Sequence, residues 1–135
     1  MYEICIEGKP FGKQRPRFNS KTHRTYTPSS TRLNEQIIAK SWRNKYGREK
    51  VQGYITLAVY AYFKPNKSDS KKTIADKLAN KLRPNKKPDA DNILKLVADA
   101  LNGVAYTDDA SITTMYCTKR YAKDEYIKIV IDMEV

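Results

Sequence analysis

Five aspartates gather in one short window of a chain in which acids are otherwise sparse: Asp89, Asp91, Asp99, Asp108 and Asp109. The whole sequence has 26 Lys and Arg residues against 15 Asp and Glu, and the only basic residue in this window is Lys95. Carboxylate oxygens without histidine or cysteine partners are the ligands that Mg²⁺ and Mn²⁺ prefer. A basic rim would draw phosphate towards such a pocket, where a bound cation opens the phosphorus to attack. The pattern is typical of metal-dependent phosphodiester cleavage.

The spacing of these acids allows three of them to converge. Pro88 disfavours a helix just before it, so Asp89 should be extended and Asp91 should cap or begin a helix. A helix over 91–101 is about 16 Å long, and the segment after it reaches about 20 Å when extended. The chain can therefore double back and bring Asp109 close to Asp91.

Lys95 lies one helical turn from both Asp91 and Asp99, on a polar stripe. An ammonium group there can stabilise negative charge on a phosphate or on a leaving oxygen. Simpler interpretations stay open at this point. Asp89 and Asp91 are also suited to capping a helix, Asp91 and Lys95 to forming a solvated pair, and Asp108 and Asp109 to forming a turn.

The elements that must position these residues follow from periodicity and turn signals. Strands are predicted at 2–7, 54–63, 111–121 and 126–134. Helices are predicted from the possible capping segment 27–30 to Gly47, over 91–101, and as a short element around 72–82. The polar turn 122–125 predicts that the last two strands form a hairpin. The expected fold is α+β, with a mixed, mostly antiparallel sheet of about four strands and two main helices, in a single domain over 1–135.

Apolar side chains recur on one face of each main element. In the first helix they are Leu33, Ile37, Ile38 and Trp42. In the strand 54–63 they are Ile55, Leu57, Val59, Ala61 and Phe63. In the helix 91–101 they are Ile93, Leu94, Val97, Ala98 and Leu101. These positions are the predicted core.

The formal net charge of +11 and the pI near 9.6 favour a polyanionic partner, with nucleic acid the first candidate. The phosphate contacts predicted from the basic segments are Lys13, Arg15, Arg17, Lys86 and Lys87. A solvated, solubilising face is the alternative for these residues. Phe18 is expected to be a buried aromatic flanking a strand.

The first residues lack the basic and apolar regions of a secretory signal, and no apolar run is long enough to span a bilayer, so a cytoplasmic protein without a membrane partner is expected. Cys5 and Cys117 have no metal-binding spacing and are expected to be buried, reduced thiols in strands. With His23 as its single histidine, the chain lacks the usual nitrogen ligands of zinc.

Several spaced motifs resemble the RusA family of Holliday junction resolvases. Residues 88–95 (PDADNILK), 99–103 (DALNG) and 106–112 (YTDDASI) are similar to that family's acidic motifs. Residues 8–10 (GKP), 13–17 (KQRPR) and 26–28 (YTP) are similar to its basic opening segment. The similarity extends over nearly the whole chain, although 64–87 matches only in character.

The resemblance implies Mg²⁺-dependent cleavage of four-way DNA junctions by a homodimer, with Mn²⁺ as a substitute and paired nicks in symmetrical strands. It implies that Asp89, Asp91 and Asp109 bind the metal and that Lys95 is catalytic, with less certain roles for Asp99 and Asp108. An origin on a prophage also fits this family. With a junction as substrate, insertion of Phe18 into the junction is the alternative to its expected burial. Two other functions remain open: a Mg²⁺-dependent nuclease of other branched or single-stranded DNA, and a non-catalytic basic nucleic-acid binding module.

Overall fold

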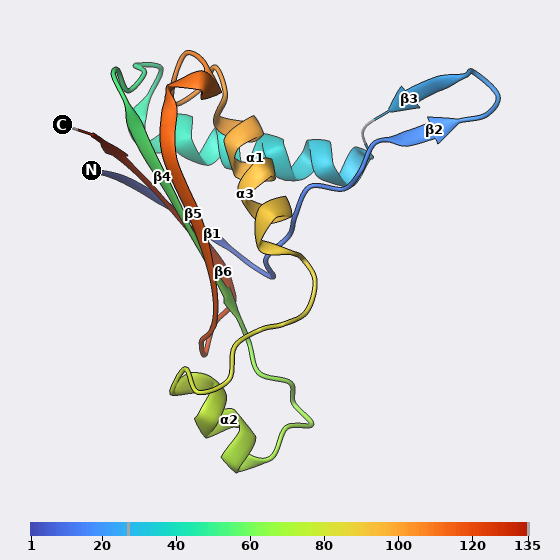
Figure 1. Ribbon diagram of the computed structural model, residues 1–135, viewed down its shortest axis with the longest axis vertical. Coiled ribbons are helices and arrows are strands. Elements are labelled where there is room, and N and C mark those ends of the chain that lie inside the picture. Colours follow the sequence, from blue (N-terminus) through green and yellow to red (C-terminus); the bar gives the residue numbers. More distant parts are fainter. Residues whose placement is uncertain (27, 135) are drawn as a thin grey trace.

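The computed structural model describes residues 1–26 and 28–134. Its centre is a four-stranded sheet built from β1 (Tyr2–Glu7), β4 (Ile55–Phe63), β5 (Ile112–Tyr121) and β6 (Tyr126–Met133), in the order β1-β6-β4-β5. The β4–β5 pair is parallel, and the β1–β6 and β4–β6 pairs are antiparallel. The predicted α+β fold with a mixed, mostly antiparallel sheet is confirmed (Figure 1).

Two helices, α1 (Ser29–Tyr46) and α3 (Ala90–Leu101), pack on one face of this sheet (Figure 1). A third helix, α2 (Lys71–Leu78), stands away from it, within the region where a short helix was predicted. The apolar faces of α1, α3 and the sheet enclose one hydrophobic core, whose largest fully buried side chains include Trp42, Tyr106 and Phe63. This packing fixes α3 against the sheet.

The alternating pattern of β4 produces the expected inward face. All five of its predicted core residues are buried, because successive side chains of a strand point to opposite sides and only one side meets the helices. The predicted face of α3 is also buried, except that Leu94 is partly exposed and Leu96 joins the core. Both elements were therefore placed correctly from periodicity.

The prediction of a hairpin between the last two strands is wrong. β5 and β6 each pair with β4, which lies between them. The turn 122–125 crosses the end of β4, where the Ala122 amide donates a hydrogen bond of 2.9 Å to the Phe63 carbonyl. A short polar turn indicates that the chain reverses direction, but it does not show whether another strand enters between the two arms.

The first helix also differs from its prediction. Ile38 and Trp42 are fully buried, but Leu33 is 57% exposed and Ile37 is 43% exposed. Only one narrow stripe of α1 is buried, and it consists of Thr31, Ile38 and Trp42. Pro28 stands at the N-cap without a side-chain capping hydrogen bond, and Thr27, also suggested as a cap, lies outside the described residues.

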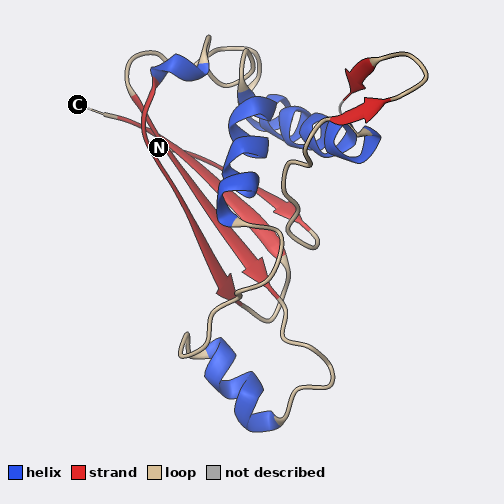
Figure 2. Ribbon diagram, turned by 45° about the vertical axis from the view of Figure 1, so that its right-hand side comes forward, coloured by secondary structure: helices blue, strands red, loops and turns tan. Residues whose placement is uncertain are grey.

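Two segments project from the body of the molecule (Figures 1 and 2). One is a ribbon of two short strands, β2 (Arg17–Asn19) and β3 (Arg24–Tyr26), which form a sheet of their own. The other carries α2 at the opposite end. No helix in the described ranges 1–26 and 28–134 is long and apolar enough to cross a membrane.

The two cysteines are free thiols, as predicted, and both lie in strands of the main sheet. Cys117 in β5 is partly buried, but Cys5 in β1 is exposed, so its predicted burial is wrong. Cys5 alternates with the buried residues Ile4 and Ile6 and therefore points to the face that the helices leave uncovered.

Candidate active site

The start of α3 carries the first pair of predicted acids. Asp89 is the N-cap residue with extended backbone angles (φ −70°, ψ 149°), and Asp91 lies in the first turn, as the sequence predicted. Both side chains are exposed. Negative charge at a helix N-terminus is stabilised by the unpaired amides and by the helix dipole. This end of α3 therefore holds two carboxylates in place while leaving their oxygens accessible.

An open groove of about 880 Å³ joins Asp89 to the basic loop, defined here as residues 8–17. Its charged lining residues are Lys9, Lys13, Arg15, Arg17, Lys87 and Asp89. Five cations therefore surround one carboxylate. Three of the predicted phosphate contacts, Arg15, Arg17 and Lys87, are exposed in this groove. The structure thus brings the basic loop and the first acid of the motif to one surface.

The basic loop is attached to both helices through its backbone. The Lys13 amide donates a hydrogen bond of 2.9 Å to the Asn92 carbonyl at the start of α3. The next amide, of Gln14, donates one of 3.3 Å to Thr31 Oγ1 on α1. Gly12 fits closely against α3, since a Cβ atom there would lie 3.0 Å from Pro88 Cβ and 3.1 Å from Asn92 Cβ. These contacts fix the loop beside Asp89.

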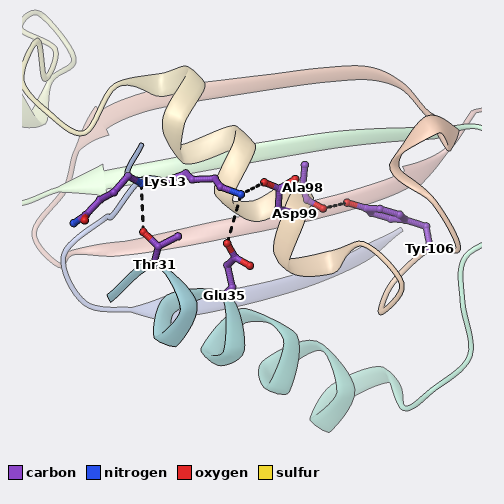
Figure 3. Close-up of polar contacts among 7 residues, drawn as sticks. Lys13, Thr31, Glu35, Ala98, Asp99 and Tyr106 are labelled. Carbon is purple, nitrogen blue, oxygen red and sulfur yellow. Dashed lines mark hydrogen bonds and ion pairs between the residues drawn. The ribbon is translucent and has the colours of Figure 1, made fainter. Parts of the chain in front are cut away.

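The side chain of Lys13 continues along α3 and forms ion pairs with Asp99 and, at 3.7 Å, with Glu35 of α1 (Figure 3). The hydrogen bond and charge of Asp99, with a smaller contribution from Glu35, raise the pKa of Lys13 against the opposing effect of burial. Its ammonium group is therefore already engaged. Although Lys13 lines the groove, a phosphate would have to compete with two carboxylates for it.

The second pair of acids lies where the chain returns from α3. Asp108 caps a short 3₁₀ helix, η1 (Asp109–Ser111), by accepting a hydrogen bond of 3.3 Å from the Ala110 amide. A hydrogen bond between the two adjacent carboxyl groups raises the pKa of Asp109, and the negative charges of Asp108 and Asp99 add to this effect. The same hydrogen bond lowers the pKa of Asp108. Three aspartates therefore contribute negative charge to this part of the site.

Tyr106 fixes the segment that leads from α3 to Asp108 and Asp109. Its ring is fully buried, and its hydroxyl donates a hydrogen bond of 2.6 Å to the Ala98 carbonyl near the end of α3 (Figure 3). Burial, followed by the negative charges of Asp109 and Asp99, raises the pKa of Tyr106, so the hydroxyl stays a donor. The segment that carries Asp108 and Asp109 is thereby tied to the helix that carries the other acids.

The expected convergence of three carboxylates is not present in the described part of the chain, where no three acidic, histidine or cysteine side chains lie together in a metal-binding group. Asp99 and Asp108 are the acids that act on Asp109. Asp99 lies eight residues beyond Asp91, or about 12 Å along a helix. The structure thus brings Asp109 towards the Asp99 end of α3 and places Asp89 in the basic groove.

The two remaining predicted cations differ in their surroundings. Lys95 is exposed, and in the described ranges it forms no ion pair with Asp91 or with Asp99. Lys86 lies outside the groove, with its ammonium 5.7 Å from the centre of the Phe63 ring. Lys95 is thus available to a ligand, whereas Lys86 packs over the end of the sheet.

Sequence reasoning missed three residues that shape this site: Gly12, Glu35 and Tyr106. Glu35 is the first acid after Glu7, and its place at the end of an acid-free stretch was a signal that could have singled it out. Gly12 and Tyr106 act through close packing and a buried hydrogen bond. Neither contact leaves a distinctive local pattern in the sequence.

Comparison with known proteins identifies the class to which this fold and site belong. The family described as endodeoxyribonuclease RusA matches residues 7–132. The chain therefore belongs to the RusA endodeoxyribonuclease family, which acts on branched DNA and whose nucleases generally depend on a divalent metal. A curated relative, "Uncharacterized protein YqaN" of Bacillus subtilis (strain 168), is 30% identical over 134 residues, which cover 96% of this chain and 94% of that protein.

Proposed function

We propose that this protein is a Mg²⁺-dependent, structure-selective endonuclease that resolves four-way DNA junctions by paired, symmetrical nicks as a homodimer. One observation carries the proposal: the groove of about 880 Å³ in which the cations of the basic loop and Lys87 surround Asp89. Cations attract the phosphate backbone whatever its sequence, and the carboxylate marks the position at which one phosphodiester would meet the catalytic groups. Family membership supports cleavage of DNA over mere binding.

In this proposal Arg15, Arg17 and Lys87 position the DNA backbone. Arginine binds phosphate through a planar fork of donors, so two arginines on a loop fixed to α3 give orientation as well as affinity. Lys13 and Lys86 contribute less to direct phosphate binding, because the first is ion-paired with Asp99 and the second packs against Phe63. Their positive charge still adds to the field of the groove.

The carboxylates of Asp89, Asp91 and Asp109 are the proposed ligands of Mg²⁺, with Mn²⁺ as a substitute. The chemistry of the donors fits these ions, because the three side chains are exposed and offer oxygen atoms alone. The three side chains do not form one group in the described ranges, so a shared ion requires the segment that carries Asp109 to approach the start of α3. The raised pKa of Asp109 is consistent with this choice, since it arises from the hydrogen bond with Asp108, from burial and from the negative charges of Asp108 and Asp99, which a bound cation would offset. When bound, the metal would polarise the scissile phosphate and lower the pKa of the attacking water.

Lys95 and the remaining acids have proposed supporting roles. Lys95 projects from the same helix as Asp91 without an ion-pair partner in the described ranges, so its ammonium can stabilise charge on the phosphate or the leaving oxygen. Asp99 positions the basic loop through Lys13. Asp108 holds η1 and orients Asp109.

The proposed homodimer follows from the chemistry of resolution. Two symmetrical nicks in one junction require two active sites related by a two-fold axis, and a second copy of the chain supplies the second site. A monomer with one groove would cut one strand at a time and release nicked junctions.

The decisive test compares the cleavage of a synthetic four-way junction, a flap, a single strand and a duplex in Mg²⁺, in Mn²⁺ and in EDTA. We expect nicks in the junction only with metal, and far faster cleavage of the junction than of the other DNAs. Asp89→Asn should abolish cleavage while leaving metal-free binding intact, and Asp124→Asn, an exposed acid in the turn 122–125, should leave both unchanged.

Two other outcomes would replace this proposal. Comparable rates on flap or single-stranded DNA would indicate a nuclease of broader specificity. Binding of the junction without nicking in either metal would indicate a non-catalytic binding module.

A further inference from the structure

The β2–β3 ribbon is a separate structural unit beside the candidate site. Arg17 pairs with Tyr26, Phe18 with Thr25 and Asn19 with Arg24, and in the described ranges these strands pair only with each other. The ribbon extends well beyond α1 and α3 in both views of the fold (Figures 1 and 2). It therefore adds nothing to the hydrophobic core and is free to contact a ligand.

The tip of the ribbon is ordered by its own turn. The side chain of Asn19 accepts hydrogen bonds from the Lys21 amide at 2.9 Å and from the Thr22 amide at 3.3 Å. His23 adopts a positive φ of 54°, which closes the turn. The ribbon is thus shaped before any ligand binds, which reduces the entropy that binding must overcome.

Phe18 is the unusual residue of this unit. Its side chain is 61% exposed, although the sequence favoured a buried aromatic at this position. Its aromatic neighbour is His23, with ring centres 6.2 Å apart and ring planes tilted by 55°, so the two rings are not stacked face to face. A large apolar ring held in water on a projecting arm has a high potential for binding, because contact with another flat ring would remove it from solvent.

The charged residues around Phe18 indicate which class of ligand the ribbon binds. The ribbon and the loop leading to it carry Arg15, Arg17, Lys21 and Arg24, and no acidic residue occurs between Glu7 and Glu35. An aromatic ring interleaved with unopposed cations is the pattern that binds nucleic acid, where cations contact phosphates and the ring stacks on a base. A two-stranded ribbon is also narrow enough to enter the major groove of DNA.

The ribbon is continuous with the candidate active site. Arg15, Pro16 and Arg17 line the groove that contains Asp89, and Phe18 is the next residue. A DNA strand whose phosphate occupied the groove would therefore run directly past the Phe18 ring. In a continuous duplex both faces of each base are already stacked, so Phe18 would find no free face. At a branch point the stacking is interrupted.

We propose that Phe18 stacks on an exposed base at the branch point of the DNA and thereby makes the ribbon a reader of DNA structure. This inference deepens the proposed function, on which it rests, by assigning the selectivity for branched DNA to one side chain. The arginines supply affinity for any DNA, and the aromatic ring adds affinity only where a base is unstacked. The preference for a junction over a duplex then comes from Phe18.

The test measures binding without metal, so that cleavage does not interfere. A four-way junction and a matching duplex carry 2-aminopurine at the positions that flank the branch, and stacking on an aromatic ring quenches its fluorescence. The variants are Phe18→Ala, Phe18→Trp and, as a matched control, Tyr54→Ala. Tyr54 is a similarly exposed aromatic, at 67%, but lies outside the ribbon just before β4. Circular dichroism verifies that each variant is folded.

We expect Phe18→Ala to weaken junction binding about tenfold, within the range for loss of one stacked base, while duplex binding changes little. Phe18→Trp should keep both the affinity and the quenching, and Tyr54→Ala should match the wild type. The inference is overturned if Phe18→Ala retains wild-type affinity and quenching, or loses junction and duplex binding equally.

Mg²⁺-dependent nicking is measured in a separate assay, which distinguishes this inference from the proposed function. Phe18-dependent binding without nicking would reject the proposed function alone, and nicking with no effect of Phe18→Ala would reject this inference alone.

Discussion

The ammonium of Lys13 and the carboxylate of Asp99 meet across 86 residues of sequence. The contact fastens the basic loop along α3, and Glu35 of α1 shares it at 3.7 Å. A lysine that composition alone would assign to phosphate binding therefore holds the groove together.

A double-mutant cycle with Lys13→Met and Asp99→Asn should show a coupling of about 1–2 kcal/mol, between the values for exposed and for buried ion pairs. The two side chains are 22% and 31% exposed, so solvent screens the pair only in part. Urea unfolding of the four proteins measures the coupling. The more exposed Lys128–Glu3 pair, at 3.4 Å, is the control and should give less. Equal coupling in the two pairs would contradict the prediction.

The pH dependence of this contact has a definite sign. Asp99 raises the pKa of Lys13 above its usual 10.5, so the stabilisation is fully present below pH 10.5 and is lost as the pH rises through the folded-state pKa. The difference in unfolding free energy between the wild type and Lys13→Met should therefore be constant near neutral pH and shrink in strong alkali. Tyrosine ionisation is common to both proteins and cancels in this difference.

Enlarging Gly12 should loosen the basic loop. A Cβ atom there would lie 3.0 Å from Pro88 Cβ, so Gly12→Ala should strain this contact and Gly12→Val should strain it more. We expect a loss of stability of about 1–3 kcal/mol for the valine variant, as for other overpacked sites. Thermal unfolding measures the loss. Both variants should also bind duplex DNA more weakly, and a valine variant with wild-type stability and affinity would refute the close approach.

Removing the Tyr106 hydroxyl should leave a carbonyl at the end of α3 without its partner. Ala98 is one of the last four residues of that helix, whose carbonyls lack helical donors, and the Tyr106 hydroxyl lies 2.6 Å from its oxygen. Tyr106→Phe should cost about 1–3 kcal/mol of unfolding free energy. Tyr60→Phe, whose hydroxyl meets that of Tyr116 at an exposed position, serves as the control and should cost less.

The two thiols should differ in reactivity. Burial raises the pKa of Cys117 to about 11, so roughly one thousandth of that thiol is ionised at pH 8. Cys5 is exposed on β1. Iodoacetamide at pH 8 should therefore modify Cys5 first, and mass spectrometry of the peptides identifies the site. In concentrated urea both cysteines should react, and preferential labelling of Cys117 in the native protein would contradict its burial.

Local patterns predicted the parts of the fold that depend on local physics. The alternation of β4 and the apolar face of α3 arise from strand and helix periods, which are visible in any short stretch. Pro88 and the acids after it placed the start of α3 correctly, because a proline restricts only its immediate neighbour.

The wrong predictions concern side chains and strand edges whose surroundings are set by other elements of the fold. Leu33 and Ile37 fit the apolar spacing of α1 but are exposed, since the rest of the fold covers only a narrow stripe of that helix. The strands β5 and β6 were predicted to pair because their turn is short, whereas β4, encoded some fifty residues earlier, lies between them. The Lys13–Asp99 contact likewise depends on how α1 and α3 pack, which no local pattern records.

The position of β6 in the sheet also sets an order of assembly. Of the four strands in this sheet it is the last to leave the ribosome, yet it lies between β1, the first of the four, and β4. β1 and β4 each pair with β6 and not with each other. The sheet therefore stays in two pieces until residues 126–133 have been synthesised. The nascent chain therefore carries its acidic motif and its basic loop long before the sheet that holds them together exists, and a ribosome stalled before β6 would display an incomplete groove.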